Sequence, residues 1–161
     1  MSTIYYFASE EKLEQLDNPY IQSLSVNQAL QLGIQVDLEC FDETLDCDEP
    51  DVILYCSDEQ KFGYPSIYEL QKEDYYENIG TEKQFCVQLQ ADVRSNEVLT
   101  IVLEYIQKQK KRCQEIEVWN VWLGEYNIPH VVKRSFCKIE DVTVEKLKEF
   151  YENDNVCMCI R

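Results

Sequence analysis

The chain has 161 residues, of which 45% are apolar, and its formal net charge is −16 at neutral pH. This length suits one domain that buries roughly two-thirds of its unfolded surface, and the apolar content excludes a disordered chain. No stretch approaches the roughly 20 apolar residues of a membrane span. The start of the chain lacks the basic region and long apolar run of a signal peptide. We therefore expect a cytoplasmic protein that has no membrane partner.

The first 80 residues predict short elements in an irregular order. Residues 4–8 predict a strand, and Ser9 predicts the cap of a short helix after it. Ser25 and Gln28 have the spacing of a capping box, and Gly33 predicts the end of the helix that they begin. Residues 37–51 hold eight Asp or Glu and no Lys or Arg, which predicts a solvated loop. Residues 52–56 and 66–70 predict two further strands.

The second half has a more regular pattern. Apolar residues alternate over 83–90, which predicts a strand with one apolar face. Ser95 and Thr143 predict the starts of two helices, and residues 116–123, 131–139 and 156–160 predict three further strands. The resulting order, β-α-β-β-α-β, is that of a ferredoxin-like module. The fold class is therefore α+β, with a ferredoxin-like second half (81–161) that an irregular acidic first half covers or extends.

A ferredoxin-like sheet has both helices on one face, and strand alternation then assigns the side chains to faces. The side chains expected toward the helices are Phe85, Val87, Leu89, Trp119, Val121, Leu123, Phe136, Val156, Met158 and Ile160. Those expected on the opposite face are Cys86, Val118, Trp122, Cys137, Cys157 and Cys159. A face so poor in charge needs a cover. We expect the first half to lie over it or to extend the sheet beside the last strand. Residues 1–161 are thus predicted to form a single domain with subdomains 1–80 and 81–161.

Charge is distributed unevenly between the two halves. Residues 1–80 carry 18 Asp or Glu against three Lys or Arg, and residues 81–161 carry 13 against 12. Eight of the 11 tyrosines also lie in the first half. Tyr among carboxylates suits recognition of a Lys/Arg-rich protein, because Tyr supplies rigid contact area. The predicted partner-binding residues are Asp42, Glu43, Asp46, Asp48, Glu49, Tyr75 and Tyr76.

Several kinds of site are disfavoured by the sequence. The start of the chain lacks a signal peptide and the core is large enough without disulfides, so we expect the eight cysteines to be reduced. They lack C-x-x-C spacing, so we expect no metal site and no redox pair. The acidic stretch lacks the Gly and Glu of a calcium-binding EF-hand loop. Any catalytic triad would have to use His130, the one histidine, which follows Pro129 in a predicted turn. No phosphate-binding glycine motif is present, and the negative charge disfavours nucleic acid. We expect no cofactor.

The sequence therefore predicts a non-enzymatic domain that binds a basic protein partner. An immunity-type or inhibitor-type neutraliser of a basic toxin or nuclease would have such a surface. Two alternatives stay open: a small-ligand sensor or enzyme that uses a pocket on the sheet face, and a housekeeping domain whose charge has no binding role. The oligomeric state is not predicted.

Overall fold

The computed structural model describes residues 2–37, 41, 44, 46–71, 79–123 and 132–161. These residues form an α+β fold with a six-stranded mixed sheet and three α-helices. Their contacts divide the chain into a large unit, Met1–Asp17 with Gly63–Arg161, and a small unit, Asn18–Phe62. Whether the whole chain unfolds as one domain stays a prediction.

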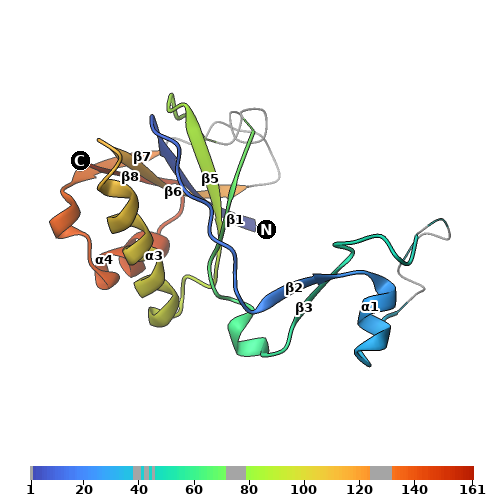
Figure 1. Ribbon diagram of the computed structural model, residues 1–161. Coiled ribbons are helices and arrows are strands. Elements are labelled where there is room, and N and C mark those ends of the chain that lie inside the picture. Colours follow the sequence, from blue (N-terminus) through green and yellow to red (C-terminus); the bar gives the residue numbers. More distant parts are fainter. Residues whose placement is uncertain (1, 38–40, 42–43, 45, 72–78, 124–131) are drawn as a thin grey trace. The chain divides into compact units, whose positions relative to one another are not determined.

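The sheet of the large unit has the order β4-β5-β1-β6-β8-β7. Its strands are β1 (Ser2–Ser9), β4 (Ser66–Glu69), β5 (Phe85–Gln90), β6 (Ile116–Leu123), β7 (Lys133–Cys137) and β8 (Val156–Ile160). Strand β7 is parallel to β8, and every other neighbouring pair is antiparallel. Helices α3 (Asn96–Lys110) and α4 (Val144–Tyr151) lie on the same face of this sheet (Figure 1).

The predicted order of elements from β5 to β8 is confirmed, and so are the helix caps. Ser95 and Thr143 accept hydrogen bonds from backbone N–H groups in the first turns of α3 and α4. The strand order does not show the ferredoxin-like arrangement, because β1 lies between β5 and β6. The first half therefore contributes a central strand, and β7, not a strand of the first half, lies beside β8.

The assignment of faces is correct for β5 and β8 and wrong for β6. Cys86, Cys157 and Cys159 lie on the face away from the helices, here called the thiol face. Trp119 and Val121 also lie on the thiol face, whereas Val118 packs toward the helices. Strand β6 is mainly apolar on both faces, each with one buried polar residue (Glu117 and Asn120), so alternation cannot tell the faces apart. The pairing with β1 decides, because Phe7 is opposite Val118 and Tyr6 is opposite Trp119.

The predicted sheet faces of two β7 side chains are also wrong, and so is the predicted helix after Ser9. Cys137 packs against the core under the helices, and Phe136 is exposed. No helix follows Ser9; the described residues 10–17 run in irregular conformation instead. The Glu14 N–H donates to Gln109 of α3 (3.2 Å), and the Glu14 carbonyl oxygen accepts from the Tyr105 hydroxyl (2.7 Å). These long-range hydrogen bonds occupy backbone groups that a local helix would otherwise use.

The small unit contains α1 (Val26–Gln31) and an antiparallel pair of β2 (Ile21–Leu24) and β3 (Ile53–Cys56). The capping box is confirmed: Ser25 accepts from the Gln28 N–H, and the Gln28 side chain accepts from the Ser25 N–H. Gly33 follows the helix with a φ of 75°, which favours glycine. Strand β2 was not predicted from the sequence.

Candidate functional site

The predicted binding residues that the structure describes are exposed. Asp46, Asp48 and Glu49 lie in the acidic segment of the small unit, and all three are exposed. The start of α1 holds this segment, because the Asn27 side chain donates to Asp48 (2.8 Å) and the Asn27 N–H donates to the Cys47 carbonyl oxygen (3.1 Å). Asp42, Glu43, Tyr75, Tyr76 and His130 lie outside the described residues.

The small unit combines strong negative charge with exposed apolar side chains. Residues 18–62 contain ten Asp or Glu and one Lys, a formal charge of 1 − 10 = −9. Leu32 is 62% exposed and Leu54 is 60% exposed. Tyr20, Leu30 and Phe62 are exposed as well. A six-residue helix and a two-stranded ribbon offer little interior in which to bury such side chains. An apolar patch with a charged rim is typical of an interaction site, and the small unit supplies both kinds of side chain.

A second candidate site is a charged pocket in the large unit, with a volume of about 400 Å³. Its walls are formed by Glu10, Gly80, Glu82, Lys83, Glu115, Glu117 and Arg134. The sheet register explains why these residues converge. The end of β1 lies opposite the start of β6, with Ala8 facing Glu117, and opposite the start of β5, with Ser9 facing Phe85. Arg134 comes from β7, at the edge of the sheet.

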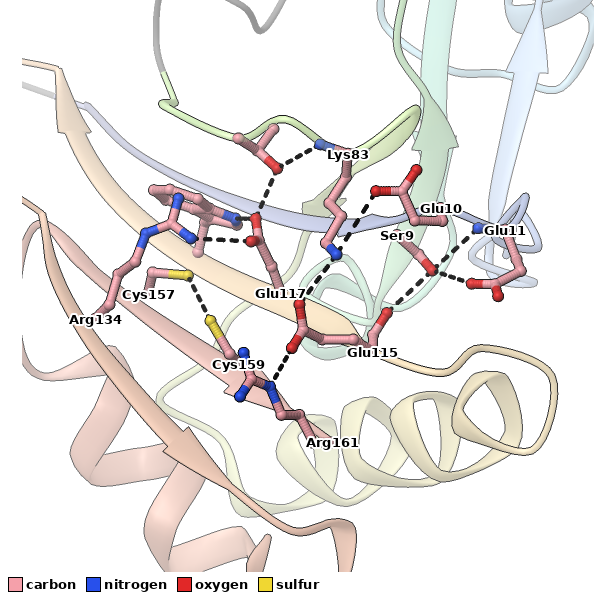
Figure 2. Close-up of polar contacts among 12 residues, drawn as sticks. Ser9, Glu10, Glu11, Lys83, Glu115, Glu117, Arg134, Cys157, Cys159 and Arg161 are labelled. Carbon is pink, nitrogen blue, oxygen red and sulfur yellow. Dashed lines mark hydrogen bonds and ion pairs between the residues drawn. The ribbon is translucent and has the colours of Figure 1, made fainter.

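Glu117 is a buried carboxylate at the base of this arrangement, with 3% of its surface exposed. One carboxylate oxygen accepts from the Thr81 hydroxyl (2.6 Å) and the Trp119 indole N–H (3.0 Å). The other accepts from the Arg134 guanidinium (3.1 Å), as Figure 2 shows. Arg134 also donates to the Gly80 carbonyl oxygen (2.8 Å) and lies 5.0 Å from the centre of the Trp119 ring. Buried charges in proteins are retained when they are paired and hydrogen-bonded in this way.

Glu115 forms a second group of ion pairs nearer the solvent. It pairs with Lys83 (3.0 Å) and with Arg161, and Lys83 also approaches Glu10 (3.7 Å; Figure 2). The hydrogen bonds from Arg161 and then Lys83 lower the pKa of Glu115 below its ordinary value. Burial opposes the charge on Lys83, but the hydrogen bond and attraction of Glu115 outweigh it and raise the pKa of that ammonium. Both partners of this pair stay charged at neutral pH.

The thiol face contains the cysteines that suggested a metal or redox site. Cys157 and Cys159 have their sulfur atoms 3.8 Å apart, and both are buried. Burial raises the pKa of Cys86 to about 12 and also raises the pKa of Cys157 and Cys159. Thiolates are the reactive and metal-binding form, so these positions are chemically inert at neutral pH. In the described ranges, no group of three or more His, Cys, Asp or Glu could hold a metal ion.

Thiol labelling tests this interpretation. We expect iodoacetamide at pH 8 to modify Cys47, which is exposed, and to leave Cys86, Cys157 and Cys159 unmodified in the native protein. At pH 8 an ordinary thiol is ionised in about a quarter of the molecules, whereas a thiol of pKa about 12 is ionised in about one molecule in ten thousand. Mass spectrometry of the labelled peptides, with and without urea, measures the difference. Modification of Cys157 at the rate of Cys47 would contradict it.

The sequence interpretation did not identify Glu117, Thr81, Lys83 or Arg134 as a group. One signal was available: Glu117 is the one charged residue in the apolar run Ile116–Leu123. A charge inside such a strand has to be paired, but its partners come from the segment before β5 and from β7. Spacing along the chain cannot identify partners this distant.

Within the described parts of the chain, no helix is both long enough and apolar enough to cross a membrane. Comparisons of the chain with protein-family models, with curated protein sequences and with solved structures gave no match.

Proposed function

We propose that this protein binds a basic protein partner through the small unit, residues 18–62. The observation that supports this most strongly is the combination of a −9 charge with the exposed side chains of Leu32 and Leu54. Carboxylates attract a cationic partner over a distance, and apolar contacts formed after docking slow its dissociation. A surface of this kind would fit an inhibitor or immunity-type neutraliser of a basic toxin or nuclease.

The test is the rate of partner association in low and high salt. A partner captured from lysate of the source cells is purified, and its association with the full-length protein is followed by stopped-flow fluorescence. The screening length is about 10 Å at 0.1 M salt and about 3 Å at 1 M. We expect the association rate to fall at least tenfold over this range, because electrostatic steering contributes about tenfold or more.

Charge variants locate the effect. Neutralising Asp42, Glu43, Asp46, Asp48 and Glu49 together as Asn or Gln is expected to slow association about tenfold. A control variant neutralises five exposed carboxylates of the large unit and so has the same net charge: Glu104, Glu140, Glu149, Glu152 and Asp154. Its association rate is expected to stay within about twofold of the wild-type rate. Equal slowing by both variants, or none by either, would remove the small unit as the binding surface.

Apolar variants test the second part of the proposal. Leu32→Ser and Leu54→Ser remove exposed side chains, so we expect the free energy of unfolding to change by less than about 0.5 kcal/mol. The dissociation rate is expected to rise, because a truncated contact at an interface mainly changes that rate. An unchanged dissociation rate in both variants would mean that these leucines lie outside the interface.

A further inference from the structure

The charged pocket of the large unit has no role in the proposed partner binding, which uses residues 18–62. We propose that it binds a cationic nitrogen group, an ammonium or a guanidinium, of a small molecule or of a protein side chain. The proposal is independent of the docking surface on the small unit and is tested separately from it.

The size and polarity of the pocket restrict the kind of ligand that it can bind. A volume of about 400 Å³ is in the range of small-molecule sites and is much larger than a single ion requires. Six of its seven wall residues are charged, and the seventh is Gly80. An apolar ligand would have to desolvate these charges without replacing their hydrogen bonds. The pocket therefore suits a small polar group.

The pairing of the wall residues determines the sign of the ligand charge. Both cations of the wall are already paired, Arg134 with Glu117 and Lys83 with Glu115. Two carboxylates remain. Among the described residues, Glu82 is exposed and makes no hydrogen bond or ion pair, and Glu10 makes only its 3.7 Å approach to the shared Lys83. An anion would meet these two unneutralised carboxylates, whereas a cation would complement them.

The charged residues next to the pocket wall also favour a cationic ligand. Arg161 pairs with Glu115 from outside the pocket, and Glu11 lies next to Ser9 (Figure 2). With these two included, the described residues in and beside the pocket comprise five carboxylates and three cations, a formal charge of 3 − 5 = −2. A metal ion is disfavoured, because the described residues include no group of three or more His, Cys, Asp or Glu that could hold one.

The same wall already binds one guanidinium, that of Arg134. This group is held by the Glu117 carboxylate (3.1 Å), the Gly80 carbonyl oxygen (2.8 Å) and the face of the Trp119 ring. Carboxylate, carbonyl oxygen and aromatic face are the three kinds of group that recognise guanidinium and ammonium cations. The pocket adds two exposed carboxylates to this chemistry, those of Glu10 and Glu82.

The test is titration of the full-length protein with agmatine, putrescine and a blocked Gly-Arg-Gly tripeptide, followed by ¹H–¹⁵N NMR. The Trp119 indole N–H is the reporter, because it donates to the wall residue Glu117. Glutarate and sodium chloride at matched ionic strength are the controls. We expect at least one cationic probe to shift the Trp119 signal with a Kd near or below about 1 mM, and glutarate to leave it unchanged. Tighter binding of the tripeptide would indicate a protein side chain, and tighter binding of agmatine or putrescine a free small molecule.

Variants separate a specific pocket from general attraction to an acidic protein. Glu82→Gln is expected to raise the Kd about threefold to tenfold, because an exposed ion pair is lost. Glu82→Asp keeps the charge and is expected to retain most of the binding. Glu104→Gln on α3 removes one charge from the other face of the sheet and is the matched control, with an expected change below about twofold.

Two results would overturn the proposal. One is the absence of any Trp119 shift with all three cationic probes up to on the order of 10 mM, tenfold above the Kd of a weak ligand. The other is an equal rise in Kd for Glu82→Gln and Glu104→Gln, which would show that the probes respond only to net charge.

Discussion

A fragment of residues 81–161 is expected to show no cooperative unfolding transition, although it contains the whole predicted β-α-β-β-α-β order. The reason is that β1 lies between β5 and β6 and pairs with both. Without β1, those two strands lose their shared neighbour, and the buried side chains of Tyr6, Phe7 and Ala8 are removed from both faces of the sheet. The expected fragment is aggregated or molten.

Circular dichroism in urea and NMR chemical-shift dispersion measure this result. The matched comparison removes the small unit instead, by replacing residues 18–62 with about four Gly/Ser residues, a length common for short connections. The ends of this deletion stay close together, because Leu16 and Ile67 exchange two backbone hydrogen bonds (2.9 and 2.7 Å). We expect this variant to unfold cooperatively.

These two variants also test the predicted single domain. A sharp transition in fragment 81–161 would contradict the central role of β1. Loss of cooperativity on deletion of residues 18–62 would show that the large unit depends on the small one, as a single folding domain requires. Cooperative unfolding of the deletion variant would show instead that Met1–Asp17 and Gly63–Arg161 fold without residues 18–62.

Replacing Arg134 with Met is expected to lower the free energy of unfolding by about 2 to 3 kcal/mol. Loss of one partner from a buried ion pair costs about 3 to 5 kcal/mol, because the other charge stays buried without compensation. The Glu117 side chain is 5% exposed and that of Arg134 is 40% exposed, so solvent screening places the expected cost below that range. Met keeps the apolar stem of the side chain, so packing is largely retained.

Urea unfolding measures this change, and two further variants interpret it. Arg94→Met is the control, because Arg94 pairs with Asp92 (2.7 Å) at an exposed position, where a pair contributes less than about 1 kcal/mol. In Glu117→Gln combined with Arg134→Met, the loss is expected to be smaller than the sum of the two single losses, because the two residues are directly coupled. An Arg134→Met cost no larger than that of Arg94→Met would contradict a structural role for the pair.

Local signals in the sequence were sufficient for the elements of the second half. Helices α3 and α4 begin where Ser95 and Thr143 predict, because a capping side chain bonds to N–H groups two or three residues away. Strand β5 has the predicted inward face because its alternation is clear. Strand β2 was missed because four residues with little alternation carry no comparable signal.

The arrangement of these elements was decided by contacts between distant residues. Strand order depends on whether β1 pairs with β5, β6 or the sheet edge, and the sequence of β1 is compatible with each. The face of β6 depends on that same pairing, since both of its faces are mainly apolar and each holds one polar residue. The Glu14 backbone shows the same effect, because α3 supplies partners that a predicted local helix would have supplied.

The two candidate sites also differ in how much of each can be predicted from the sequence. Net charge is a sum over residues, so the acidic character of residues 18–62 follows from the sequence by itself, and so does the solvated character of the described part of its acidic stretch. The pocket beside Glu117 required the tertiary structure. Its carboxylates and cations come from the end of β1, the segment before β5, the start of β6 and from β7. Only the register of the sheet brings these four segments together, because register is determined by long-range pairing and not by neighbours in sequence.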